Sequence, residues 1–386
     1  RTKHWPQPTE ATPACWPAVL TSPPPQPPNL QRHRSRRPEQ NAMPGTTALY
    51  FVASPLQYLA ARRIAATAEA GSRQVLVWYK HGVASIIKPR EWDAASYMSW
   101  PRWEPLPGVF GRHRRLRANI GLVAGLVGQC DTLHIHSAVF DTEAINYFLR
   151  ALPKACGART MRARILPDGI ISTRRYPLSA GKRLAQYARK LRRLIAPELD
   201  YWCFDGDRIG SDAAFCDRIY VLPGLPHEYP AQKVHVLPPL AEPASGQSGP
   251  AGTGRRALVI GQPLTGFELM SQADLAAVTG EIRAWLADHG FDSIDYKGHP
   301  KDGQRELAHP DYRVITPEQT LEMFMAGTHY DAVVGVRSSA LLFARQLYPA
   351  TTLVEAFGWS RIRFKSTAEK QDMERTFAAV GVATHP

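Results

Sequence analysis

The sequence has few cysteines and no long apolar run, which excludes several classes of protein. Its five cysteines are scattered along 386 residues, and none forms a Cys-x-x-Cys pair. This pattern is typical of reduced thiols in the cytoplasm, not of a disulfide scaffold or a thiolate zinc site. The longest apolar run, around 120–127, is far shorter than the roughly 20 residues of a membrane-spanning helix. Because no signal peptide is visible either, we predict a cytoplasmic protein.

Acidic residues are also under-represented, with 34 Asp and Glu against 47 Lys and Arg and a formal net charge of +13. So basic a chain favours an anionic partner, such as nucleic acid, a lipid surface, a nucleotide or an acidic glycan. No recognised nucleic-acid-binding motif is present, so we expect no nucleic acid partner. The Walker, Gly-rich dinucleotide and Gly-x-Ser-x-Gly signatures are absent as well.

The first 42 residues differ in composition from the rest of the chain. They hold 10 of the 33 prolines, and the first strand pattern begins only after Met43. We therefore predict that residues 1–42 are a disordered Pro-rich tail, or sequence upstream of a misassigned start. A Pro-rich docking arm is the functional alternative.

From Met43 onward, short β-rich runs alternate with helical patterns, which predicts an α/β fold with mostly parallel sheets. The helical patterns include 56–68, 142–152 and 271–289. The predicted strands are 48–53, 74–79, 132–136, 163–166, 218–222, 233–237, 257–260, 293–297, 312–315, 332–336 and 351–354.

A stretch rich in Gly, Ser, Pro and Ala, residues 241–254, separates two such alternating sets and is typical of a linker. The predicted organisation is an N-terminal Rossmann-like acceptor domain at 43–240, the linker, and a C-terminal nucleotide-sugar domain at 255–386. Two doubly wound domains facing a cleft resemble the layout of a GT-B glycosyltransferase. A ligand in such an arrangement binds at the carboxyl ends of the strands.

In the second half, the predicted strand 293–297 runs directly into Gly298, His299 and Pro300. This order places an imidazole at the carboxyl edge of the sheet, with glycine permitting a tight turn and proline stiffening the exit. Histidine at that edge can donate a hydrogen bond or a proton to a phosphate leaving group. A loop histidine with one backbone contact is the alternative.

Two other strand ends would face the same cleft. Ser338 and Ser339 follow strand 332–336 and precede an apolar helical run, so their hydroxyls and the helix amides can form an anion site or simply cap the helix. Gly261, Gln262 and Pro263 follow strand 257–260, and their backbone groups are candidates for contact with a nucleotide.

In the first half, strand 163–166 ends in Pro167, Asp168 and Gly169. A carboxylate at the sheet edge suits a general base that takes a proton from an acceptor hydroxyl, although a plain Pro-Asp-Gly turn needs no function. The first strand leads into Ser54, a natural helix N-cap, and then Gln57. We expect both to face the cleft near the donor carboxylate or the acceptor.

These pieces in this order resemble the bacterial sialyltransferase families, including lipooligosaccharide sialyltransferases and capsular polysialyltransferases. Those families share an acidic-acidic-Gly motif, a His-Pro motif and a Ser-Ser or Ser-Thr motif. The counterparts here are 167–169, 299–300 and 338–339, and the opening 48–57 is also similar. The resemblance spans about residues 48–345.

The resemblance implies an inverting enzyme that moves sialic acid, or a related acidic sugar, from a CMP-sugar to a glycan or glycolipid acceptor, with no cofactor and no essential metal. Asp168 would be the general base, His299 would bind the CMP phosphate and assist its departure, and Ser338 and Ser339 would hold that phosphate. One departure is that Pro167 stands where the families have a first acidic residue.

Two other enzyme classes compete with this interpretation. Polyol-phosphate transferases of the teichoic-acid type also place His-Pro and Ser-Ser in a GT-B cleft, and they use a CDP-alcohol donor. Asp205 and Asp207 form an Asp-x-Asp that would hold a divalent metal in a GT-A glycosyltransferase. Since Asp-Gly is common in turns, we favour a hairpin turn there.

A non-catalytic function is also open for the basic segment 180–197. Leu184, Tyr187, Leu191 and Ile195 recur in it at helical spacing, so the predicted helix is amphipathic. Such a helix either docks on an anionic inner-membrane surface or another polyanion, or packs its apolar face on the core. Its basic face is Lys182, Arg183, Arg189, Lys190, Arg192 and Arg193.

Overall fold

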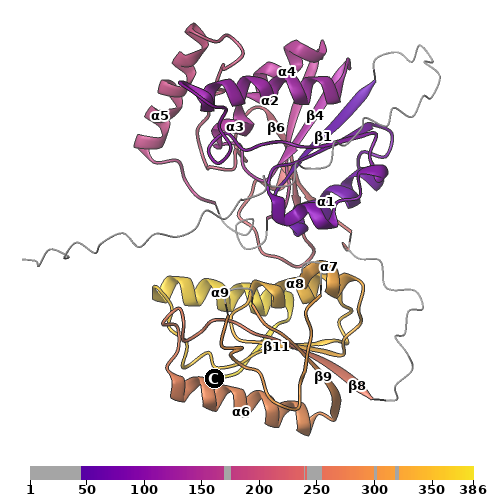
Figure 1. Ribbon diagram of the computed structural model, residues 1–386, viewed down its shortest axis with the longest axis vertical. Helices are drawn as coiled ribbons and strands as arrows, with labels where there is room; N and C mark the ends of the chain where they lie inside the picture. The colour runs from indigo at the N-terminus through magenta and orange to yellow at the C-terminus, as the bar shows by residue number, and fades with distance from the viewer. Residues whose placement is uncertain (1–44, 169–174, 239, 241–253, 300–301, 318–320) are drawn as a thin grey trace, which may run out of the picture. The chain divides into compact units, whose positions relative to one another are not determined.

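The computed structural model describes residues 45–168, 175–238, 240, 254–299, 302–317 and 321–386. Residues Met43–Pro386 form one compact unit, drawn in Figure 1. The predicted tail at 1–42 and nearly all of the predicted linker lie outside the described residues, so the proposed domain boundaries stay a prediction.

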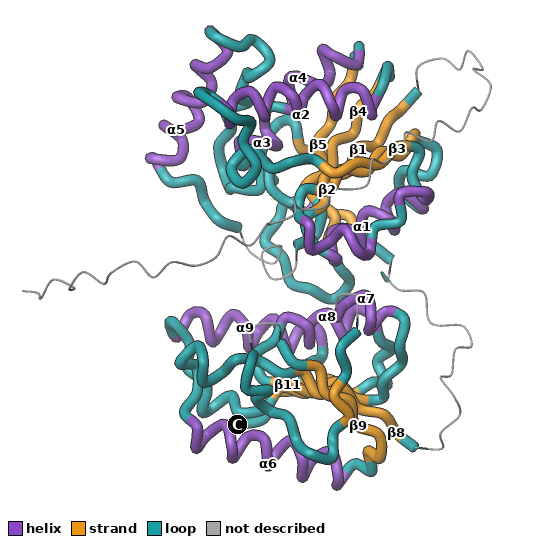
Figure 2. The backbone as a smooth tube through the Cα atoms, in the orientation of Figure 1, coloured by secondary structure: helices purple, strands orange, loops and turns teal. Residues whose placement is uncertain are grey.

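The first sheet has seven strands, all paired in parallel, in the order β3-β2-β1-β4-β5-β6-β7. Strands β1 to β5 are labelled in Figure 2. This order, in which the chain leaves β1 first to one side and later to the other, is that of a doubly wound Rossmann-like sheet. Its strands are β1 (Thr46–Val52), β2 (Arg73–Trp78), β3 (Ala94–Tyr97), β4 (Thr132–Ser137), β5 (Thr160–Ile165), β6 (Cys216–Val221) and β7 (Val234–Val236).

Helices cover both faces of this sheet because alternate side chains of a strand point to opposite faces. Phe51 packs in one buried cluster with Phe148, whereas Tyr50 and Val52 pack in another with Leu59. The helices of this half are α1 (Pro55–Ala66), α2 (Gly111–Val127), α3 (Glu143–Asn146), α4 (Phe148–Cys156) and α5 (Ala180–Lys190), with short 3₁₀ turns η1 (His81–Ile86), η2 (Pro89–Glu91), η4 (Leu191–Leu194) and η5 (Ala231–Lys233).

The second sheet repeats the plan with six parallel strands in the order β10-β9-β8-β11-β12-β13. Figure 1 shows α6 on one face of this sheet and α8 and α9 on the other. Its elements are β8 (Arg255–Ile260), α6 (Gln272–Asp288), β9 (Phe291–Lys297), β10 (Arg313–Val314), α7 (Leu321–Ala326), β11 (Ala332–Gly335), α8 (Ser339–Leu347), β12 (Leu353–Ala356), α9 (Thr367–Val380) and β13 (Ala383–Thr384).

The predicted α/β fold class, with two doubly wound parallel sheets, is confirmed, and every predicted strand is present within a few residues. Two edge strands escaped prediction: β3, half-buried and made of Ala94–Tyr97, and β13, only two residues long and exposed. Neither offers the buried β-branched run by which a strand is recognised.

The structure contradicts one alternative for segment 180–197, in which the predicted amphipathic helix packs its apolar face on the core. Leu184, Leu191 and Ile195, on its apolar face, are 72%, 64% and 93% exposed. The basic face is divided as well, because Arg189 and Arg192 turn toward the protein and pair with Asp141 and Glu143. Within the described residues, no helix combines the length and apolar character needed to cross a bilayer.

Candidate functional site

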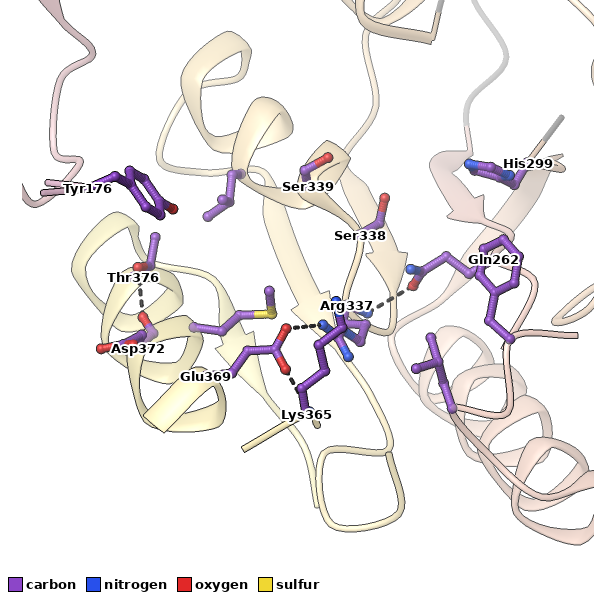
Figure 3. Close-up of a pocket in the computed structure, with 14 residues that line it drawn as sticks. Tyr176, Gln262, His299, Arg337, Ser338, Ser339, Lys365, Glu369, Asp372 and Thr376 are labelled. Carbon is purple, nitrogen blue, oxygen red and sulfur yellow. Dashed lines mark hydrogen bonds and ion pairs between the residues drawn. The ribbon is translucent and has the colours of Figure 1, made fainter. Parts of the chain in front are cut away.

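The loops that follow β8, β9 and β11 converge on one cavity of about 770 Å³, shown in Figure 3. Strands β8 and β11 flank the point where the strand order of the second sheet reverses, which is where doubly wound sheets bind ligands. The volume lies in the usual range of a small-molecule site. Its polar lining residues are Tyr176, Gln262, His299, Arg337, Ser338, Ser339, Lys365, Glu369, Asp372 and Thr376.

Ser338 caps helix α8, and its Oγ accepts a hydrogen bond of 3.2 Å from the amide of Ala340. A hydroxyl that accepts in this way keeps its own proton to donate to a ligand oxygen. The exposed Ser339 opens the helix next to it. This arrangement offers hydroxyl groups and the positive end of a helix dipole to an anion.

Arg337 is held firmly in the wall of this cavity. Its Nη2 lies 3.1 Å from Oε1 of Glu369, its Nη1 donates to the carbonyl of Arg363 at 3.2 Å, and its guanidinium lies 4.8 Å from the ring centroid of Phe364. The Arg337 amide donates to Oε1 of Gln262 at 2.9 Å, which joins the β8 and β11 loops (Figure 3).

Glu369 is a site residue that the sequence prediction missed. Burial alone would raise the pKa of its carboxyl, but the amide of Lys365 and the Arg337 guanidinium hold that pKa below its usual value. Ser366 and Glu369 form the Ser-x-x-Glu pattern of a helix start. That pattern signals α9 in the sequence, although the pairing with Arg337 is visible only in the structure.

His299 lines the cavity and is exposed. The chain beyond it is anchored, since the Tyr296 hydroxyl donates to Oδ2 of Asp302 at 3.2 Å and to the carbonyl of Glu306 at 2.8 Å. The Glu306 carboxylate in turn accepts the amide of Thr265 at 2.9 Å. The β8 and β9 loops are therefore tied together behind His299.

Three predicted nucleotide-contacting residues do not line the cavity. Gly261 and Pro263 are buried and are not among the residues that line it. Gly261 instead passes so close to the hydroxyl of Tyr296 that a Cβ would overlap it. Gly298 is half-buried and not among the lining residues, and Pro300 lies outside the described residues.

In the first half, Asp168 follows β5 and Ser54 follows β1. The Ser54 Oγ donates to Oδ1 of Asp168 across 3.5 Å and accepts the amide of Gln57 at 3.3 Å, which caps α1. Asp168, Ser54 and Ser339 line a second, smaller cavity of about 150 Å³. Since Ser339 also lines the larger cavity, the predicted base and the predicted anion site are neighbours.

Gln57 is only 3% exposed, and its Oε1 accepts the amide of Ala53 at 2.7 Å. The expectation that Gln57 faces the cleft is therefore wrong, because its side chain completes the turn into α1. Gly169, the third residue of the predicted carboxylate motif, lies outside the described residues.

The Asp-x-Asp pair does not form a carboxylate clamp. The side chain of Asp205 is 85% exposed, whereas that of Asp207 is 1% exposed and accepts the amides of Gly210 and Ser211 at 2.8 and 3.0 Å. Among the described residues, no group of three or more His, Cys, Asp or Glu side chains is placed to hold a metal ion. Asp207 thus stabilises the loop that contains it by accepting hydrogen bonds from backbone amides.

Comparison with known proteins finds a family match in the segment that contains the cavity loops. Residues 227–355 match the family model described as alpha-2,8-polysialyltransferase (POLYST), and this segment contains the β8, β9 and β11 loops. No curated protein matches the chain.

Among solved structures, the chain is similar to an alpha/beta-galactoside alpha-2,3-sialyltransferase from the luminous marine bacterium Photobacterium phosphoreum. The TM-score is 0.53 at 12% identity, over 88% of this chain and 98% of that one. It is also similar to the glycotransferase of kitacinnamycin, with a TM-score of 0.47 at 12% identity, over 89% of this chain and 86% of that one.

The two sheets, their strand order and the first of these similarities define a GT-B fold. The chain is a glycosyltransferase, and its segment 227–355, about a third of the chain, is similar to the polysialyltransferase family. The predicted resemblance to the bacterial sialyltransferase and polysialyltransferase families is confirmed.

Proposed function

We propose that this protein transfers sialic acid, or a related acidic sugar, from a CMP-sugar to a glycan or glycolipid acceptor of the cell surface, such as a capsular or lipooligosaccharide chain. The observation that carries the proposal is that His299, Ser338 and Ser339 line one cavity and lie in the segment that matches the polysialyltransferase family. We place the reaction in the cytoplasm, in keeping with the buried free thiols of Cys130, Cys156 and Cys216.

The donor phosphate would lie against the start of α8. There the hydroxyls of Ser338 and Ser339 donate to its oxygens, and the helix dipole favours its negative charge. His299, from the β9 loop, would donate a hydrogen bond or a proton to the phosphate as the bond to the sugar breaks. Arg337 would keep this wall rigid through its contacts with Glu369 and Phe364.

Asp168 would act as the general base. It would take the proton of the acceptor hydroxyl while that oxygen attacks the anomeric carbon and CMP leaves from the opposite side, which inverts the configuration. With Pro167 in place of a second carboxylate, Asp168 carries this step alone, and the hydrogen bond from Ser54 orients its Oδ1. No cofactor enters this scheme, and we propose that no metal is essential.

The CDP-alcohol donor of a polyol-phosphate transferase is the remaining alternative, and the family match favours the sialic acid donor over it. Both transfers release CMP, because a CDP-alcohol gives up its alcohol together with one phosphate, so thermal unfolding with the intact donors CMP-sialic acid and CDP-glycerol separates the two functions. A nucleotide at a hundredfold excess over its Kd adds about 2.7 kcal/mol of stability. We expect CMP-sialic acid to raise Tm more than CDP-glycerol does, and expect His299→Ala to reduce that shift. Stabilisation by CDP-glycerol but not by CMP-sialic acid would overturn the sialic acid donor.

A further inference from the structure

Helix α5 and the turn η4 direct their apolar side chains to solvent. Leu184, Tyr187, Leu191, Leu194 and Ile195 are 72%, 61%, 64%, 77% and 93% exposed. Their spacing of three, four or one residue places all five on one side of a helix. A contiguous group of exposed large apolar side chains marks an interaction surface.

The opposite side of the helix is polar and faces the protein. Gln186 is 1% exposed, and its Oε1 accepts the amide of Phe204 at 2.9 Å. Arg189 donates to the hydroxyl of Tyr201 at 3.3 Å, and Arg192 forms an ion pair with Glu143. The helix is thus amphipathic in the reverse sense to an ordinary surface helix, which buries its apolar side.

Cations border the exposed apolar side. Residues 180–197 contain six Lys and Arg and no acidic residue. Arg183 and Arg193, whose side chains are 53% and 51% exposed, reach Asp205 and Asp200 only at 3.8 and 3.9 Å. Exposed apolar side chains with flanking positive charge are complementary to an anionic lipid surface, which presents acyl chains beneath negative headgroups.

A second exposed apolar element lies next to η4. Val109 and Phe110, just before α2, are 79% and 72% exposed, and Phe110 has a φ of 60° that a bulky residue rarely adopts. Glu143 joins the two elements, because it accepts from Arg112 at 2.6 Å and also pairs with Arg192. Figure 1 shows α5 beside α3, which carries Glu143.

We propose that α5, η4 and the Val109–Phe110 loop form a docking surface for an anionic phospholipid bilayer. A soluble polyanion would engage the cations and leave the leucines and Ile195 in water. A second copy of the chain would bring the same cations against one another. Lipid is the partner that satisfies both the charge and the apolar side chains.

Co-sedimentation with vesicles tests this proposal, with phosphatidylcholine vesicles compared with mixed phosphatidylcholine and phosphatidylglycerol vesicles. The test variant removes apolar contacts and keeps every charge: Leu184→Gln, Leu191→Gln and Ile195→Gln. The matched control variant changes three exposed apolar residues on other elements: Leu122→Gln, Val236→Gln and Val314→Gln.

The wild type and the control variant are expected to bind the mixed vesicles, less so as salt is raised, while the test variant binds about tenfold or more weakly. Because the three replaced side chains are exposed, circular dichroism and Tm should stay unchanged. Transfer to a short soluble acceptor should also persist, so the outcome is independent of the proposed function.

Three results would overturn the proposal. One is equal vesicle binding by the test variant and the wild type. Another is binding to heparin that the test variant retains, without vesicle binding by the wild type, which would identify a polyanion site. The third is a wild-type dimer that the test variant converts to a monomer, which would identify a contact between copies.

Discussion

Single residues divide the proposed chemistry between the two sheets. Asp168 stands at the end of β5 and is hydrogen-bonded by Ser54, whereas His299 and Ser338 stand at the ends of β9 and β11. Each follows a buried strand, so its Cα position is fixed by the sheet while its side chain stays at the edge. Arg337 and Glu369 support this arrangement by neutralising one another within the cavity wall.

Replacing Asp168 tests the general base. We expect Asp168→Asn to lower kcat by about a hundredfold to ten-thousandfold, because the amide has the same shape but cannot take the proton. Binding of CMP, measured by calorimetry, should remain near that of the wild type. Asp205→Asn is the matched control and should retain full activity, since Asp205 is exposed in its turn. Normal turnover by Asp168→Asn would mean that another group is the base.

At the scale of elements, hydrogen bonds beneath the cavity stabilise the loops after β8 and β9. The Tyr296 hydroxyl and the Glu306 carboxylate connect the β8 loop with the chain after His299. Gly261 permits this connection because a larger residue would collide with Tyr296. The position of His299 therefore depends on packing beneath the cavity as well as on β9.

Gly261→Ala tests that close approach. The added Cβ must displace the Tyr296 hydroxyl, so we expect a loss of about 1–3 kcal/mol in the free energy of unfolding, measured with urea. In a Tyr296→Phe background the same substitution should cost less. Gly266→Ala, in the same loop with only an ordinary contact at 3.8 Å, should be nearly neutral. An equal cost of Gly261→Ala in both backgrounds would contradict the steric explanation.

Asp295 on β9 gives a pH-dependent prediction. Burial alone would raise the pKa of its carboxyl, but hydrogen bonds from Arg313 at 2.7 and 2.9 Å and from Tyr330 at 2.6 Å lower it below its usual value. A carboxyl whose folded-state pKa is depressed contributes stability above its unfolded pKa of about 3.9, and that contribution is lost as pH falls through the folded value.

We therefore expect Asp295→Asn to destabilise the protein by about 1–2 kcal/mol near pH 7, because the buried Tyr330 hydroxyl loses its hydrogen bond to a charged carboxylate, whereas the exposed Arg313 side chain stays hydrated. The difference from the wild type should shrink as pH falls below 4. Urea unfolding of both proteins across this pH range measures it. A difference that stays constant with pH would show that the carboxylate charge is not responsible.

The sequence predicted the helices and strands better than it predicted which of their side chains are buried or paired. The strands of both sheets were recognisable because buried β-rich runs alternate with helical patterns. The exposure of the apolar side of α5 could not be predicted from the sequence, because the same spacing of Leu184, Leu191 and Ile195 arises whether that side faces the core or solvent. The Arg337–Glu369 pair was also hidden, since no local pattern connects residues 32 positions apart.

The whole molecule combines two sheets with the same strand order, each winding outward in both directions from its first strand. Motif order along the chain predicted this plan and the neighbourhood of Asp168, Ser338 and Ser339. It did not predict that Gln57, Gly261 and Pro263 are buried, because a residue beside a motif can turn either into the cavity or into the packing below it. That choice is made by tertiary contacts such as the one with Tyr296.

The most direct test is transfer itself. The protein is incubated with CMP-sialic acid and a glycan acceptor in the presence of EDTA, and the release of CMP and the mass of the acceptor are followed together. We predict that one CMP appears for each sialic acid residue added to the acceptor, and that Asp168→Asn forms neither product. Intact CMP-sialic acid alongside consumption of CDP-glycerol under the same conditions would contradict the account.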